Sequence, residues 1–114
     1  MVGSIYYILM PYSHFRQAKG RPVLAVHELD KNDILVMPLT SNLTRRGFKI
    51  TQKDIAFGAL KKDSVIIVPK LTAVDRNLLE TSRHIATLKK ATFSEIKHAM
   101  CSELHCIPSS ETDR

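Results

Sequence analysis

The segment Ser4–Met10 constrains the fold of this chain most, because it is apolar on both faces of the strand that it predicts. It consists mainly of β-branched, aromatic and aliphatic residues, which favour strands. Pro11 ends it, because proline cannot continue a hydrogen-bonded ladder. Such a strand needs cover on each side, which a helix or a second subunit can supply.

Other short apolar runs predict further strands. Residues 23–27 and 34–39 flank the turn-forming sequence Asp-Lys-Asn-Asp, which predicts a hairpin. Residues 48–51 alternate apolar and polar side chains, as a half-buried strand does. Residues 64–68 form the most apolar run, and the neighbouring Pro69 predicts a sheet edge or a bulge there.

Helix is predicted late in the chain, apart from a short helical turn at residues 77–79. Thr92 and Glu95 have the spacing of a capping box, with Thr92 as N-cap. The apolar residues that follow recur at helical spacing: Phe93, Ile96, Ala99, Met100 and Leu104. The predicted fold class is therefore mainly β, a small curled sheet or barrel with one C-terminal helix.

A chain of 114 residues provides the core of one domain, which we place at residues 1–107, with 108–114 as a flexible tail. No run of 18 apolar residues predicts a membrane span, and the first residues lack the pattern of a signal peptide. Cys101 and Cys106 cannot form a disulfide framework, which favours a cytoplasmic location.

Basic residues gather where acidic residues are missing. The chain has 17 Lys and Arg against 11 Asp and Glu, a net charge of +6. Residues 1–27 hold Arg16, Lys19 and Arg21 and no acid, and residues 34–53 hold four further bases and no acid. This distribution favours a polyanionic partner such as a nucleic acid, although a solvated basic face would also explain it.

Common enzyme signatures are absent from the sequence: there is no glycine-rich phosphate loop, no H-E-x-x-H and no G-x-S-x-G. His98, Cys101 and His105 could share a helix face, with Cys106 nearby. No second pair of ligands at suitable spacing accompanies them, whereas a closed zinc site needs four ligands. We therefore predict no metal and no cofactor.

Arg21 is the first candidate site residue. Pro22 biases its backbone toward an extended conformation, which places Arg21 at the junction of a loop and a strand. The planar guanidinium offers a fork of donors that matches phosphate oxygens. The alternative is an ordinary surface arginine at a strand start.

Three small polar residues, Thr40, Ser41 and Asn42, follow the third predicted strand, and Arg45 and Arg46 come soon after. Two hydroxyls and an amide can bind a phosphate. They can equally bond their own backbone as turn residues do. The two arginines favour an anion site.

Several segments in order carry a resemblance to a known family: Gly3–Tyr6, Gly20–Val26, Pro38–Ser41, Gly58–Ile66 and Leu71–Asp75. Together they resemble the MazF/PemK/Kid toxin endoribonucleases of bacterial type II toxin–antitoxin systems. The resemblance implies an SH3-like curled β-barrel with a C-terminal helix, as in CcdB and PemK. It further implies a homodimer, a cognate antitoxin partner and metal-independent cleavage of single-stranded RNA such as mRNA, by attack of the 2′-OH.

The resemblance also assigns site residues. The family's active arginine lies in an R-P pair, which maps to Arg21, and its active hydroxyl lies in a T-S pair, which maps to Thr40 with Ser41 beside it. Arginine can stabilise the charge that builds on the phosphorane. The residues expected to contact RNA are Arg16, Lys19, Asn42, Arg45 and Arg46.

The sequence departs from the family in two places. The loop before Arg21 carries no acid where the family has one, but His14 lies near the position of a histidine that some members use. His14 could act as acid or base near neutral pH, or be an exposed loop histidine. Ile67 and Pro69 replace an Arg and an Asp of one branch. The alternatives are therefore a catalytically degenerate RNA- or peptide-binding module on the same fold, or an inhibitor of the gyrase-poison type.

Overall fold

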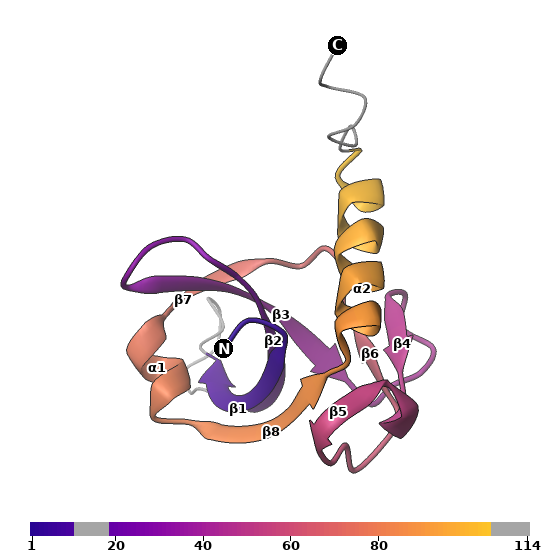
Figure 1. Ribbon diagram of the computed structural model, residues 1–114, viewed down its shortest axis with the longest axis horizontal. Coiled ribbons are helices and arrows are strands. Elements are labelled where there is room, and N and C mark those ends of the chain that lie inside the picture. The colour runs from indigo at the N-terminus through magenta and orange to yellow at the C-terminus, as the bar shows by residue number, and fades with distance from the viewer. Residues whose placement is uncertain (11–18, 106–114) are drawn as a thin grey trace.

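The structure is a computed structural model and describes residues 1–10 and 19–105. In that part of the chain eight strands form one curved antiparallel sheet in the order β4-β6-β3-β2-β1-β8-β5, and β7 pairs with β3 outside this path (Figure 1). The strands are β1 (Ser4–Met10), β2 (Lys19–Glu28), β3 (Asp33–Thr40), β4 (Phe48–Ile50), β5 (Ile55–Gly58), β6 (Ser64–Ile66), β7 (Thr72–Asp75) and β8 (Arg83–Leu88). The helices are the 3₁₀ turn η1 (Gln52–Asp54), α1 (Arg76–Glu80) and α2 (Lys90–Glu103).

Strand β3 has a divided edge. It pairs with β2 on one side, and on the other with β7 from Asp33 to Val36 and then with β6 at Leu39 and Thr40. Pro38 lies between these two ladders; it has no N–H to donate, but its carbonyl accepts the N–H of Ile67 at 2.9 Å. The change of partner at Pro38 gives the sheet its curl, which makes a half-barrel.

Both faces of β1 are covered by this chain itself at the start of the strand. Ile5 belongs to one core cluster, which includes Ile96 of α2, and Tyr6 belongs to a second, which includes Leu79 of α1. Figure 1 shows the two helices at opposite sides of the sheet. The need for cover that the sequence indicates is thus met within one subunit at Ile5 and Tyr6, whereas Leu9 remains 59% exposed.

The predicted first strand, the hairpin of residues 23–39 and the helical turn at 77–79 are confirmed. The mainly β fold with a C-terminal helix is confirmed as well. The sequence patterns did not indicate β5, β7 and β8, which are short or begin with polar residues, such as Arg83 and His84. Their pairing partners, rather than their own composition, make them strands.

Two local predictions are wrong. Strand β6 ends at Ile66 and lies between β4 and β3, so Pro69 marks neither a sheet edge nor a bulge in that strand. Helix α2 has Lys89 as its N-cap, and Thr92 lies inside the first turn, where its hydroxyl donates to Asp54 Oδ1 at 3.0 Å. The capping box of this region is instead at η1.

The apolar face of α2 is shorter than its sequence spacing indicates. Ile96 is fully buried and Phe93 and Met100 pack against the core, but Leu104 is half-exposed at the C-cap. Neither α1, with 5 residues, nor α2, with 14, is long and apolar enough to cross a membrane among the described residues. The tail predicted at 108–114 lies outside the described residues.

We predict that Thr92→Val lowers the free energy of unfolding by about 1–3 kcal/mol, because it removes the hydrogen bond that the buried Thr92 donates to a carboxylate. Urea denaturation followed by circular dichroism measures this. Thr92→Ser keeps the hydroxyl and should unfold close to the parent, as should Ser94→Ala on the exposed side of α2. Equal stability of Thr92→Val and the parent would contradict the role given to this bond.

Candidate functional site

Arg21 and Thr40 lie at the same end of the β2–β3 hairpin. The last pair of this ladder is Val23 with Pro38, although both strands run on, β2 back to Lys19 and β3 forward to Thr40. Arg21 and Thr40 each stand two residues beyond that pair. Because side chains alternate along a strand, both project on the face of Val23 and Pro38.

The sequence predicts Arg21 at the junction of a loop and a strand, but Arg21 lies inside β2. It is the third residue of the strand, is half-buried and pairs with the buried Ile8 of β1. Pro22 is tolerated within the strand because the ladder to β3 begins only at Val23, so β2 is paired to β1 alone at this point.

The polar side chains after β3 order their own turn. Thr40 Oγ1 accepts the N–H of Asn42 at 3.2 Å, and Asn42 Oδ1 accepts the N–H and the hydroxyl of Thr44 at 3.1 and 2.6 Å. These oxygens therefore accept hydrogen bonds within their own turn, as the side chains of turn residues commonly do. The hydroxyl hydrogen of Thr40 remains a donor, because a hydroxyl accepts and donates at once. Ser41 is exposed.

The expected RNA-contact residues do not form one cluster. Arg45 is exposed in the turn after β3, whereas Arg46 forms an ion pair with Glu103 at the end of α2. Lys19 opens β2. His14 and Arg16 lie outside the described residues. Arg46 thus ties the turn to the helix.

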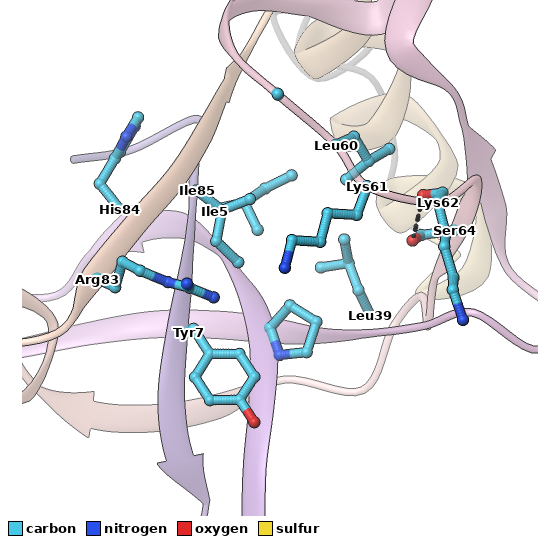
Figure 2. Close-up of a pocket in the computed structure, with 12 residues that line it drawn as sticks. Ile5, Tyr7, Leu39, Leu60, Lys61, Lys62, Ser64, Arg83, His84 and Ile85 are labelled. Carbon is cyan, nitrogen blue, oxygen red and sulfur yellow. Dashed lines mark hydrogen bonds between the residues drawn. The ribbon is translucent and has the colours of Figure 1, made fainter.

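A cleft of about 560 Å³ opens where β2 and β3 cease to pair. Pro22 and Leu39, the first residue of each strand beyond the last pair, both line it. Figure 2 shows the rest of the lining, which comes from β1, β8 and the segment between β5 and β6: Ile5, Tyr7, Ala59, Leu60, Lys61, Lys62, Ser64, Arg83, His84 and Ile85. No local sequence pattern indicated this cleft, because its lining comes from five separate parts of the chain.

The rim of the cleft is basic. Lys61, Lys62 and Arg83 line it, and none of its described lining residues is acidic. The guanidinium carbon of Arg83 lies 5.5 Å from the centroid of the Tyr7 ring, in the range of a cation–π contact. His84 turns away from the cleft in Figure 2, and its ring contacts Tyr6 and Phe57.

Tyr7 rests directly on the backbone of β2. A Cβ built on Gly20 would lie 2.1 Å from the Tyr7 Oη and 2.5 Å from Cζ, so only glycine at this position leaves room for the ring where it stands. Tyr7 pairs with Pro22 and with Arg83 in the sheet, and Gly20 is its diagonal neighbour. The residue next to Arg21 therefore positions a wall of the cleft.

Two carboxyl groups with lowered pKa values, Glu28 and Asp30, lie at the opposite end of β2. Arg76 donates to Glu28 and holds the pKa of that carboxyl below its ordinary value. The backbone N–H groups of Asn32 and Asp33 lower the pKa of Asp30 in the hairpin turn. These carboxylates stabilise the turn at neutral pH and do not line the cleft.

The residues considered for a metal lie on α2 and after it. Among the described residues no three His, Cys, Asp or Glu side chains gather as a metal site would require. Cys106 is outside the described part of the chain.

Comparisons with known proteins agree with the fold. The profile of one family, the PemK-like, MazF-like toxins of type II toxin-antitoxin systems, matches residues 1–104. Among solved structures the chain is similar to one in the crystal structure of MazE-MazF (form II) from Deinococcus radiodurans, with a TM-score of 0.66 and 16% identity over 91% of this chain and 94% of that chain. At this identity the likeness shows a shared fold alone. No curated protein sequence matches significantly.

The turn into the wall of the cleft depends on Gly58, whose φ is +90°. A Cβ there would lie 2.5 Å from the carbonyl oxygen of Ile85 and 2.9 Å from the Cα of Ala86, both of which are backbone atoms. We predict that Gly58→Ala lowers the free energy of unfolding by about 2–4 kcal/mol, through backbone strain and overpacking.

Urea denaturation measures this effect. Lys61→Ala, an exposed change in the same segment, should stay within about 0.5 kcal/mol of the parent. If Gly58→Ala unfolds at the denaturant concentration of the parent, the close approach of Gly58 to β8 is wrong.

Proposed function

We propose, from the fact that this chain belongs to the PemK-like, MazF-like toxin family of type II toxin-antitoxin systems, that it is an endoribonuclease toxin that cleaves single-stranded RNA. The observation that carries the proposal to particular residues is the shared end and shared face of Arg21 and Thr40 beyond the last β2–β3 pair. A phosphodiester between them would contact a guanidinium and a hydroxyl.

The proposed reaction uses the substrate's own nucleophile. The 2′-oxygen loses its proton to a base and bonds to the adjacent phosphorus, while the bond to the 5′-oxygen breaks and that oxygen receives a proton. The products are a 2′,3′-cyclic phosphate and a 5′-hydroxyl. Because no water is activated, the step requires no metal ion.

Arg21 would stabilise the negative charge on the phosphoryl oxygens, and Thr40 would donate its hydroxyl hydrogen to one of them. Arginine is a poor proton donor because the guanidinium keeps its proton throughout the physiological pH range. The proton transfers therefore fall to another group, for which we propose His14. Ser41 stands beside Thr40 as a second hydroxyl, and Lys19, Asn42, Arg45 and Arg46 are proposed to hold the flanking strand with Arg16.

The partner that we propose is an antitoxin protein. The similar chain from Deinococcus radiodurans was crystallised as a MazE-MazF structure, which supports a toxin of this fold binding an antitoxin. The net charge of +6 and the acid-free rim of the cleft favour an acidic segment of that partner. Such a segment would compete with RNA for the same positive surface.

We predict that Arg21→Ala lowers the rate of RNA cleavage by about 10²–10³-fold and that Thr40→Ala lowers it severely, because each removes a preorganised donor to the phosphate. The measurement is a time course on a long single-stranded RNA at low salt, with EDTA present and the cut ends mapped. Products should carry a cyclic phosphate.

The control for charge is Lys31→Ala, which removes an exposed base in the hairpin turn at the far end of β2 and should cleave at the parent rate. His14→Ala should be as slow as Arg21→Ala if His14 moves a proton. Cleavage by Arg21→Ala at the parent rate would move the active site elsewhere. A parent protein that binds RNA without cutting it would favour the degenerate binding module.

We also propose a homodimer. The support comes from the family and from large apolar side chains that remain exposed, such as Leu9, Leu43 and Leu104 at 59%, 47% and 51%. Sedimentation at micromolar concentration should show a species of twice the 12.9 kDa chain mass. A species of single-chain mass alone would contradict this.

A further inference from the structure

We propose that the cleft beside β1 is a base-binding subsite for one unpaired nucleotide of the RNA, with Tyr7 as the stacking surface and Arg83 and Lys61 as contacts to its phosphates. This inference rests on the proposed endoribonuclease function and extends it from the scissile phosphate to a base elsewhere in the same RNA.

The cleft has the shape that a flat apolar ligand needs. Ile5, Leu39 and Ile85 make its floor, and its volume of about 560 Å³ lies within the range of about 300–1,000 Å³ that is typical of small-ligand sites. A nucleobase presents two apolar faces and a polar edge. The floor can cover one face while the rim contacts the edge and the backbone.

Tyr7 supplies the aromatic wall. Its side chain is 42% exposed although it belongs to a strand whose neighbouring residues are buried, and the ring is held in place by contact with Gly20. Arg83 lies over the same ring. Unpaired bases stack on aromatic rings and on guanidinium planes, and the cleft holds one of each in contact with the other.

The charges of the cleft select a polyanion. Figure 2 shows the Lys61 ammonium reaching into the space between Arg83 and Leu39, and Lys62 lies on the same wall. With no acid in the described lining, an anionic ligand gains from all three cations. An acidic peptide shares this charge but not the planar surface that matches Tyr7, so RNA fits the cleft better.

The cleft and the scissile phosphate lie on opposite faces of the sheet. Pro22 and Leu39 line the cleft, whereas Arg21 and Thr40, their neighbours in β2 and β3, project from the other face because side chains alternate along a strand. A base in the cleft would therefore belong to a nucleotide that the RNA reaches by passing around the end of the β2–β3 ladder. The subsite would give RNA binding a preference for the base at that one position.

The test uses binding rather than cleavage. A fluorescein-labelled oligonucleotide spans the mapped cut site, with its 2′-oxygens methylated so that it cannot react, and anisotropy gives its affinity. Tyr7→Ala should weaken binding by about 5- to 150-fold, the usual effect of losing one stacked base. Tyr7→Phe should bind within about twofold of the parent, because the ring remains.

Arg83→Gln should weaken binding and reduce its salt dependence, whereas Lys31→Gln, the matched control for charge, should change neither by as much. Thermal unfolding by circular dichroism reports whether each variant is folded. If Tyr7→Ala does not fold, the comparison of Arg83→Gln with Lys31→Gln decides the matter.

A scan with single abasic nucleotides locates the base. One abasic position should weaken binding to the parent as much as Tyr7→Ala does, and should cost nothing further in Tyr7→Ala. Parent-like binding by folded Tyr7→Ala and Arg83→Gln overturns the subsite while leaving cleavage by the parent intact. A parent that neither binds nor cleaves RNA overturns the proposed function itself. A Tyr7 dependence shown by a polyglutamate peptide, and not by RNA, assigns the cleft to a protein partner and overturns the inference.

Discussion

Strand β3 can form hydrogen bonds along only two edges, and the molecule uses one of those edges twice. The first half of that edge carries β7, the second half carries β6, and Pro38 lies between the two ladders. The sheet therefore cannot stay flat, since its strands leave β3 in two directions. On the opposite edge the pairing with β2 stops at the same residue, and the cleft begins there. Curl, cleft and the placement of Arg21 and Thr40 all follow from this one division.

Hydrophobic patterning was enough to identify β1, the hairpin and the mainly β class, because each is encoded by contiguous residues. Strand β8 was not identified, since it starts with Arg83 and His84 and becomes a strand by pairing with β1 and β5. Thr92 shows the same limit: its spacing to Glu95 matches a cap, but Asp54, distant in sequence, takes its hydroxyl. Local sequence specifies what a segment can do, and tertiary contact decides which option is used.

The site was predictable in part for the same reason. The R-P and T-S pairs could be placed at one end of a hairpin, because antiparallel pairing follows from a short turn. The positive cleft could not be predicted, because its cations come from the half of the chain in which bases and acids nearly balance along the sequence. None of the described acids of that half lines the cleft. Arg46, from the most basic stretch, is instead engaged by Glu103.

The contact between Tyr7 and Gly20 couples two strands at a place where a side chain on either one excludes a side chain on the other. Positions 7 and 20 therefore form a single unit of variation rather than two independent ones. In a related chain of this fold, a residue larger than glycine at position 20 should be accompanied by a smaller residue at position 7. The ring that walls the cleft and the glycine before Arg21 would then be inherited or lost together.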